Sequence, residues 1–110
     1  MLLFKPYHIP LIQAHVKVDT RRMWPEDGPR VKINSKHLIK TKIFTKENFG
    51  VVQILSLRWE PLLDITEEGA KREGNYTRES YLKLFKEIYP DAPENPKLWV
   101  IGFTYLGDGQ

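Results

Sequence analysis

The chain has 110 residues, 41% of them hydrophobic and 28% charged, which predicts one globular domain over residues 1–110 and excludes a disordered chain. It contains no cysteine, so disulfides, thiolate nucleophiles and cysteine-ligated metals are excluded. The net charge is +3, and the three histidines (His8, His15 and His37) lack metal-site spacing, so we expect no metal and no cofactor.

The first half of the chain predicts short strands and turns. Residues 2–4 indicate a buried strand, and residues 9–14 indicate one or two helical turns with a proline in the first turn. Residues 17–24 are charged and typical of an extended segment, which a turn cluster follows at residues 25–29. Residues 37–46 are rich in β-formers and predict a strand.

The second half predicts two strands separated by two helices. Residues 51–59 give the strongest strand pattern, and residues 98–105 predict a final, mostly buried strand. Between them, a short helix over residues 67–73 is capped by Asp64 or Thr66 and ends at Gly74. Thr77 caps a second helix, whose apolar residues at three- and four-residue steps face a core. We therefore predict an α+β fold, a small β-barrel of about five strands with two or three helices on one side.

The distribution of charge and hydropathy bears on location and partners. No apolar run reaches the roughly 18 residues of a membrane helix, and Lys5 and Pro6 interrupt the apolar start too early for a signal peptide. We expect a cytoplasmic monomer without a membrane partner. Residues 1–50 hold ten Lys or Arg and four Asp or Glu, whereas residues 51–110 hold seven and ten. This asymmetry favours a surface for a polyanion such as RNA, and the ion-pair-rich surface of a thermophile protein is an equal alternative.

Lys17 and Thr20 are the strongest candidates for chemistry. Side chains alternate in a regular strand, which would place Lys17 on the face opposite Thr20. A helix end or a bulge between them would bring them together. A buried lysine with a depressed pKa could then be the base for a threonine nucleophile. The alternative is a solvated lysine and a threonine that closes a strand.

Two groups of basic residues are candidates for ligand binding. Arg21 and Arg22 offer planar forks to phosphate, and Trp24 offers a stacking surface, although a surface arginine and a core tryptophan would look the same. Further along, the strand expected over residues 37–46 and its flanks would align lysines on one face: Lys36, Lys40, Lys42 and Lys46. Such a stripe could bind phosphates, with Lys40 and Lys42 at its centre, or protect an edge strand from aggregation.

Glu73 is unusual in its position. It ends the expected short helix, where a carboxylate opposes the helix dipole unless a partner compensates for it.

Several motifs, which together span nearly the whole chain, resemble the ASCH domain family. They are Leu3-Phe4-Lys5-Pro6, Ala14-x-x-Lys17-x-x-Thr20-x-Arg22, Asp64-Ile65-Thr66-Glu67-Glu68 with Ala70 and Glu73-Gly74, Glu87-Ile88-Tyr89-Pro90, and Leu98-Trp99-Val100-Ile101-Gly102-Phe103. The resemblance implies a PUA-like β-barrel with a cleft between barrel and helices, in which RNA or a nucleoside would bind.

Some relatives in this family are small amidohydrolases that remove the acetyl group from N4-acetylcytidine. The resemblance implies Lys17, Thr20 and Glu73 as the catalytic set, with Thr20 as nucleophile, Lys17 as its base or oxyanion partner, and Glu73 as proton shuttle or substrate anchor. The chain departs from the family at His15, where glycine is usual, and at Val18, where threonine is usual. A positive φ at His15 would therefore be costly.

Three functions follow from these observations. The first is binding of RNA or a nucleoside through Lys17, Arg21, Arg22, Trp24 and Glu73, with Lys40 and Lys42 as further RNA contacts. The second is hydrolysis of the amide of acetylated cytidine by Lys17, Thr20 and Glu73. The third is a scaffold for protein partners that has no small ligand.

Overall fold

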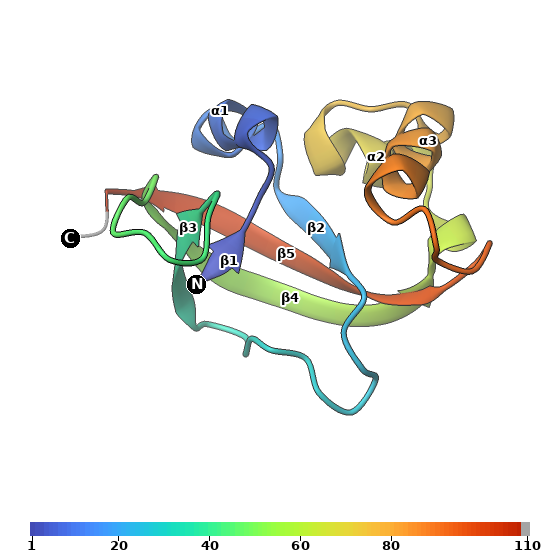
Figure 1. The fold of residues 1–110 in the computed structure, drawn as a ribbon, viewed down its shortest axis with the longest axis horizontal. Coiled ribbons are helices and arrows are strands. Elements are labelled where there is room, and N and C mark those ends of the chain that lie inside the picture. The colour runs from blue at the N-terminus through green and yellow to red at the C-terminus, as the bar shows by residue number, and fades with distance from the viewer. Residues whose placement is uncertain (109–110) are drawn as a thin grey trace.

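The protein has an α+β fold, as the sequence predicts; the structure, a computed structural model, describes residues 1–108 (Figure 1). The strands are β1 (Leu2–Leu3), β2 (Asp19–Arg22), β3 (Lys36–Lys40), β4 (Val51–Pro61) and β5 (Lys97–Gly107). The α-helices are α1 (Ile9–Gln13), α2 (Glu67–Gly74) and α3 (Arg78–Ile88), and two 3₁₀ helices are η1 (Pro6–His8) and η2 (Leu62–Asp64). No helix within residues 1–108 is long and apolar enough to cross a bilayer.

The strands form one sheet in the order β1-β3-β4-β5-β2. The long antiparallel pair β4 and β5 lies at its centre, and β1 is the strand that pairs in parallel, with β3. Because β1 and β2 are the two edges, the sheet is open, an arrangement consistent with the expected PUA-like barrel. Figure 1 shows α1, α2 and α3 on one side of this sheet, and the loop between β2 and β3 extending on the other side.

Local capping explains where the two longer helices begin and end. The Thr66 side chain accepts a hydrogen bond from the Gly69 amide at the start of α2, and Thr77 forms a reciprocal capping box with Ser80 at the start of α3. The prediction that Gly74 is the C-cap of α2 was wrong, because Gly74 is still helical and Asn75 is the left-handed cap, with φ of 66°. Asparagine tolerates this conformation better than most residues.

The strand predicted over residues 37–46 is shorter than expected. β3 ends at Lys40, and residues 41–46 form an irregular loop. The cause is the lack of further ladder partners, since β4 pairs with residues 36–38 and β1 pairs with Ile39 and Lys40. The prediction of one continuous lysine stripe was therefore wrong: Lys42 lies on the loop, where the neighbouring Phe44 is 99% exposed.

Two apolar clusters make up the core, and the site lies between them. The first joins the N-terminal segment and α1 to the sheet, through Leu2, Phe4, Ile9, Ile12, Val31, Ile39, Val52, Ile54, Ile101 and Phe103. The second joins α2, α3 and η2 to the start of β5, through Leu62, Ile65, Ala70, Tyr81, Phe85 and Leu98. β5 contributes to both clusters, so it fixes the distance between them.

Candidate ligand-binding site

A cavity of about 340 Å³ lies between the two core clusters. One wall is aromatic and aliphatic, and consists of Phe4, Tyr81, Leu84, Phe85, Ile88 and Tyr89. The other wall is polar, and consists of Lys5, His8, Lys17, Thr20, Arg21, Arg22 and Glu73. All three residues of the catalytic set expected from the resemblance therefore face one space, together with both arginines of β2.

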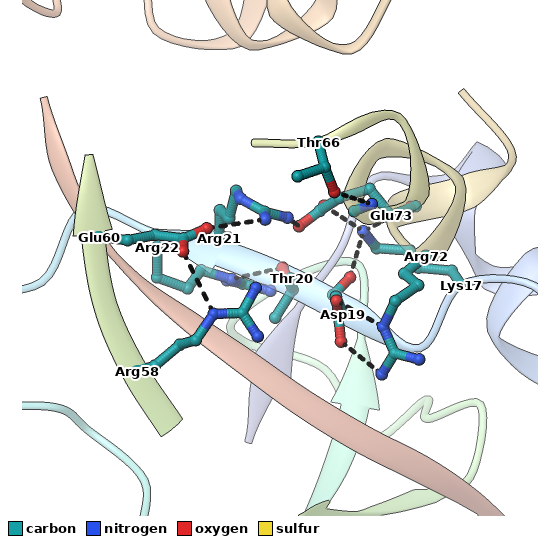
Figure 2. Close-up of polar contacts among 11 residues, drawn as sticks. Lys17, Asp19, Thr20, Arg21, Arg22, Arg58, Glu60, Thr66, Arg72 and Glu73 are labelled. Carbon is teal, nitrogen blue, oxygen red and sulfur yellow. Dashed lines mark hydrogen bonds and ion pairs between the residues drawn. The ribbon is translucent and has the colours of Figure 1, made fainter. Parts of the chain in front are cut away.

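Glu73 is at the centre of a buried ion-pair cluster (Figure 2). Its Oε1 lies 2.9 Å from Lys17 Nζ, and its Oε2 lies 2.8 Å from Arg21 Nη1. Lys17 Nζ also donates to the Glu73 backbone carbonyl at 2.8 Å. The positive charge of Lys17 thus compensates both for the Glu73 carboxylate and for the negative end of the α2 dipole. This explains how an acid is tolerated at the end of α2.

Lys17 is completely enclosed by acceptors. In addition to its two bonds with Glu73, Nζ donates to the Asp19 carbonyl at 3.0 Å. Burial lowers the pKa of Lys17, while the charge of Glu73 opposes that shift. Three acceptors match the three protons of an ammonium group, and no hydrogen bond joins Lys17 Nζ to Thr20 Oγ1 within the described residues. In this arrangement Lys17 is a charged anchor.

A chain of alternating charges extends from Glu73 to the sheet surface. Arg21 Nη2 donates to Glu60 Oε1 at 3.1 Å, and Arg58 Nε donates to Glu60 Oε2 at 3.2 Å (Figure 2). Burial is the largest influence on the pKa of Arg21 and acts to lower it, but the charge of Glu73 and the hydrogen bonds to Glu73 and Glu60 act together against it, and the pKa is raised. Arg21 is therefore a permanently charged part of the cavity wall.

The side chains of Thr20 and Arg22 on β2 are joined by a hydrogen bond. Arg22 Nε donates to Thr20 Oγ1 at 3.1 Å, and Arg22 Nη2 donates to the Leu3 carbonyl at 2.7 Å. The Arg22 guanidinium also lies over the Phe4 ring, 4.8 Å from its centroid. Because the Thr20 oxygen already accepts from Arg22, its hydroxyl proton is available to donate into the cavity.

The turn after α1 brings Lys17 to the same cavity as Thr20. Strand β2 begins only at Asp19, so strict alternation does not extend back to Lys17; the helix α1 ends at Gln13, before Lys17 rather than between Lys17 and Thr20. The turn includes His15 with φ of 59°, the positive value that the sequence analysis identified as costly for a residue other than glycine.

His8 and Tyr81 also line the cavity, although neither was a candidate site residue from the sequence. His8 Nε2 lies 2.8 Å from the Tyr76 hydroxyl, and burial, with the charges of Lys17 and Arg22, lowers the pKa of His8 to about 3. Burial and the nearby Glu73 raise the pKa of Tyr81 well above its usual value. The sequence held one sign of a site role for Tyr81, which is that its side chain carries a hydroxyl within the otherwise apolar stripe of α3. Among residues 1–108, no group of three His, Asp or Glu side chains is placed to hold a metal.

Three residues expected to contact ligand do not line the cavity. Trp24 packs against the first core cluster, and Lys40 Nζ donates to the Thr45 carbonyl at 2.8 Å. Lys42 is exposed on the loop after β3. However, Thr41, which lies between the two lysines, does line the cavity. Lys40 and Lys42 are therefore the sequence neighbours of a residue that lines the cavity, Thr41.

Two solved structures share this fold. Protein EF3133 from Enterococcus faecalis V583, of family DUF984, has a TM-score of 0.69 at 16% identity, covering 97% of this chain and 82% of its own. An ASCH domain from Lactobacillus crispatus JV V101 has a TM-score of 0.69 at 14% identity, covering 96% of this chain and 77% of its own. The sequence matches no family model and no curated protein. At these identities the likeness establishes the fold alone.

Proposed function

We propose that this chain, which has an ASCH-type fold, binds a nucleoside unit in the cavity between its two core clusters. One observation supports this function: an aromatic and aliphatic wall from α3 faces a wall of hydrogen-bonding groups from β2 and α2. A nucleobase has the matching properties, an apolar face and an edge of donors and acceptors. The volume of about 340 Å³ is within the range of roughly 300–1,000 Å³ of small-molecule sites.

The polar wall suits the Watson–Crick edge of cytosine. That edge carries a ring acceptor and an exocyclic amine donor. Thr20 supplies a free hydroxyl proton for the acceptor, and Glu73 supplies a carboxylate whose remaining lone pairs can accept from the amine. The ion pairs with Lys17 and Arg21 hold that carboxylate in place before the ligand arrives, so little order has to be gained on binding.

Calorimetric titration with cytidine and N4-acetylcytidine tests this proposal. Leu84 on α3 lines the cavity, so Leu84→Trp should fill it and abolish binding. Lys83→Trp is the matched control, because it adds the same indole to an exposed position of the same helix that does not line the cavity. Equal affinities for wild type and Leu84→Trp would show that ligand binds elsewhere.

A second function, hydrolysis of the acetyl amide of N4-acetylcytidine, is supported by the shared cavity of Lys17, Thr20 and Glu73. Thr20 Oγ1 would attack the acetyl carbonyl, the amine would leave with a proton, and water would release acetate from the threonine ester. Lys17 would first have to exchange its present acceptors for Thr20. Its lowered pKa assists proton release, whereas its three hydrogen bonds oppose it.

Release of cytidine from N4-acetylcytidine tests the hydrolase. Thr20→Ala should abolish turnover while ligand binding loses only the one hydrogen bond that Thr20 would donate, and Lys17→Ala should also abolish turnover. Thr41→Ala is the matched control, because it removes another threonine hydroxyl from the same cavity. Turnover that persists in Thr20→Ala would eliminate Thr20 as the nucleophile.

A nucleoside unit can also be part of RNA. Lys40 and Lys42 flank Thr41 at the cavity, so a strand leaving the cavity past Thr41 would meet them. In that case, affinity for a single-stranded oligonucleotide should fall steeply with salt and should weaken in Lys40→Ala and Lys42→Ala. A chain that is only a scaffold for protein partners would show none of these effects of salt and substitution.

A further inference from the structure

The polar wall of the cavity has more positive than negative charge. Its lining includes four cations, Lys5, Lys17, Arg21 and Arg22, and a single carboxylate, Glu73. Lys17 and Arg21 share Glu73, and Arg21 also pairs with Glu60. Within residues 1–108, neither Lys5 nor Arg22 has a carboxylate at ion-pair distance. The wall therefore has two cations that the protein does not neutralise.

Arg22 is both unpaired and rigidly held. Its Nε and Nη2 donate to Thr20 and to the Leu3 carbonyl, and its guanidinium plane lies over the Phe4 ring. Its third nitrogen, Nη1, makes no hydrogen bond in the part of the chain that the structure describes. The side chain is half-buried, and a charge that is partly removed from water without a counter-ion carries an energetic cost. An anion bound at Nη1 would remove that cost, and the preformed position limits the entropy lost on binding.

His8 and Tyr81, which also line the cavity, do not supply the missing negative charge. His8 is neutral near pH 7, because burial and the charges of Lys17 and Arg22 lower its pKa to about 3. The pKa of Tyr81 is raised by burial and by Glu73, so its hydroxyl keeps its proton. The positive potential is therefore left for the ligand to neutralise.

We propose that Arg22 Nη1 and Lys5 form an anion subsite that takes a phosphate group of the ligand, so that the cavity prefers a nucleotide to an uncharged nucleoside. This inference rests on the proposed nucleoside site. The phosphate can belong to a free mononucleotide or to a phosphodiester of a strand, and both present the same oxygens to the guanidinium.

Titration with cytidine and with cytidine 5′-monophosphate tests the subsite. The wild type should bind the monophosphate about tenfold or more tightly, as expected for one or two charge-assisted hydrogen bonds. This ratio should fall to within about threefold of unity in Arg22→Gln and decrease partly in Lys5→Ala. Arg30→Gln, at an exposed position outside the cavity, is the matched control and should keep the full ratio.

The outcomes separate this inference from the proposed function. Equal affinities of the wild type for the two compounds would overturn the subsite and leave the nucleoside site intact. Binding of neither compound would overturn both. Lys5 makes no side-chain hydrogen bond in residues 1–108, so Lys5→Ala remains informative if Arg22→Gln does not fold. A cytidine trinucleotide without a terminal phosphate that binds as tightly as the monophosphate, and loses affinity in Arg22→Gln, would assign the phosphate to a strand.

Discussion

Glu73 determines the charge balance of the site, because its single buried carboxylate forms ion pairs with two buried cations, Lys17 and Arg21. Lys17 and Glu73 have side chains that are each 2% exposed, and the Arg21 side chain is 1% exposed. Such clusters are poor sources of net stability, because desolvation offsets much of the attraction. Loss of the carboxylate from such a cluster is costly, because the cations that remain are buried and no water can replace it. The cluster therefore acts to position charged groups around the cavity.

Replacement of Glu73 by glutamine should be strongly destabilising. Glu73→Gln keeps the shape of the side chain but leaves Lys17 and Arg21 without its charge, so we expect a loss of about 3–5 kcal/mol in the free energy of unfolding, measured with urea. Glu68→Gln, on the exposed surface of the same helix, is the control and should change stability by no more than about 0.5 kcal/mol. Similar losses in both variants would contradict the charge-balance argument.

His8 should make the protein sensitive to acid. Its folded-state pKa is about 3, below the ordinary 6.5, so the unfolded chain binds the proton first as pH falls. The stability contribution is complete above about pH 6.5 and decreases toward pH 3, by at most about 1.4 kcal/mol per pH unit. His8→Gln lacks this slope, so urea unfolding of the two proteins over pH 3–7 should give curves that converge as pH falls. Parallel curves would refute the assignment.

At the scale of elements, α3 links local capping to the ligand site. Tyr81, Leu84, Phe85 and Ile88 form one stripe on this helix, and all four line the cavity. The stripe begins at Tyr81, the residue that follows the Thr77–Ser80 capping box. Fixing the first turn of α3 therefore also fixes the start of the apolar wall.

Loss of the Thr77 cap should weaken the protein by a modest amount. Thr77→Ala removes the oxygen that accepts from the Ser80 amide, and we expect a loss of about 1 kcal/mol, seen as a lower Tm. Thr77→Ser retains the hydroxyl and should restore most of the stability. If alanine and serine at this position gave the same Tm, the capping box would have no energetic role.

At the scale of the whole molecule, the cavity exists because two apolar clusters are joined by a charged layer. Lys17, Arg21 and Glu73 occupy the region where α2 meets β2. Arg72 of α2 also binds Asp19 of β2 through two hydrogen bonds of 2.9 and 3.1 Å (Figure 2). Strand β5 contributes residues to both clusters. We propose from this that residues 1–110 are one cooperative domain.

Mild truncations in the two clusters should therefore shift one common transition. Ile12→Val in the first cluster and Phe85→Leu in the second should each lower stability by about 1 kcal/mol. Thermal unfolding followed by far-UV and near-UV circular dichroism should show a single midpoint for each variant. Two midpoints, with Phe85→Leu moving only one of them, would indicate two separate folding units.

Elements that depend on neighbouring residues could be predicted from the amino-acid sequence. The three- and four-residue steps of α3, its Thr77 cap and the apolar runs of β4 and β5 depend on neighbouring residues, so they were predicted close to their observed places. The awkward position of Glu73 was also visible, because the dipole of a helix is a local property. The catalytic roles of Lys17, Thr20 and Glu73 came from the resemblance and stay predictions.

Features that depend on contacts between distant residues became visible in the folded chain. Lys17 and Glu73 are 56 positions apart, and no pattern in either segment names the other. The end of β3 at Lys40 was set by its partners β1 and β4, and propensity alone extended the strand too far. The unpaired state of Arg22 follows from the lack of a carboxylate at ion-pair distance from it within residues 1–108. Strand ends, ion pairs and cavities depend on which surfaces meet, and that is decided when the whole chain packs.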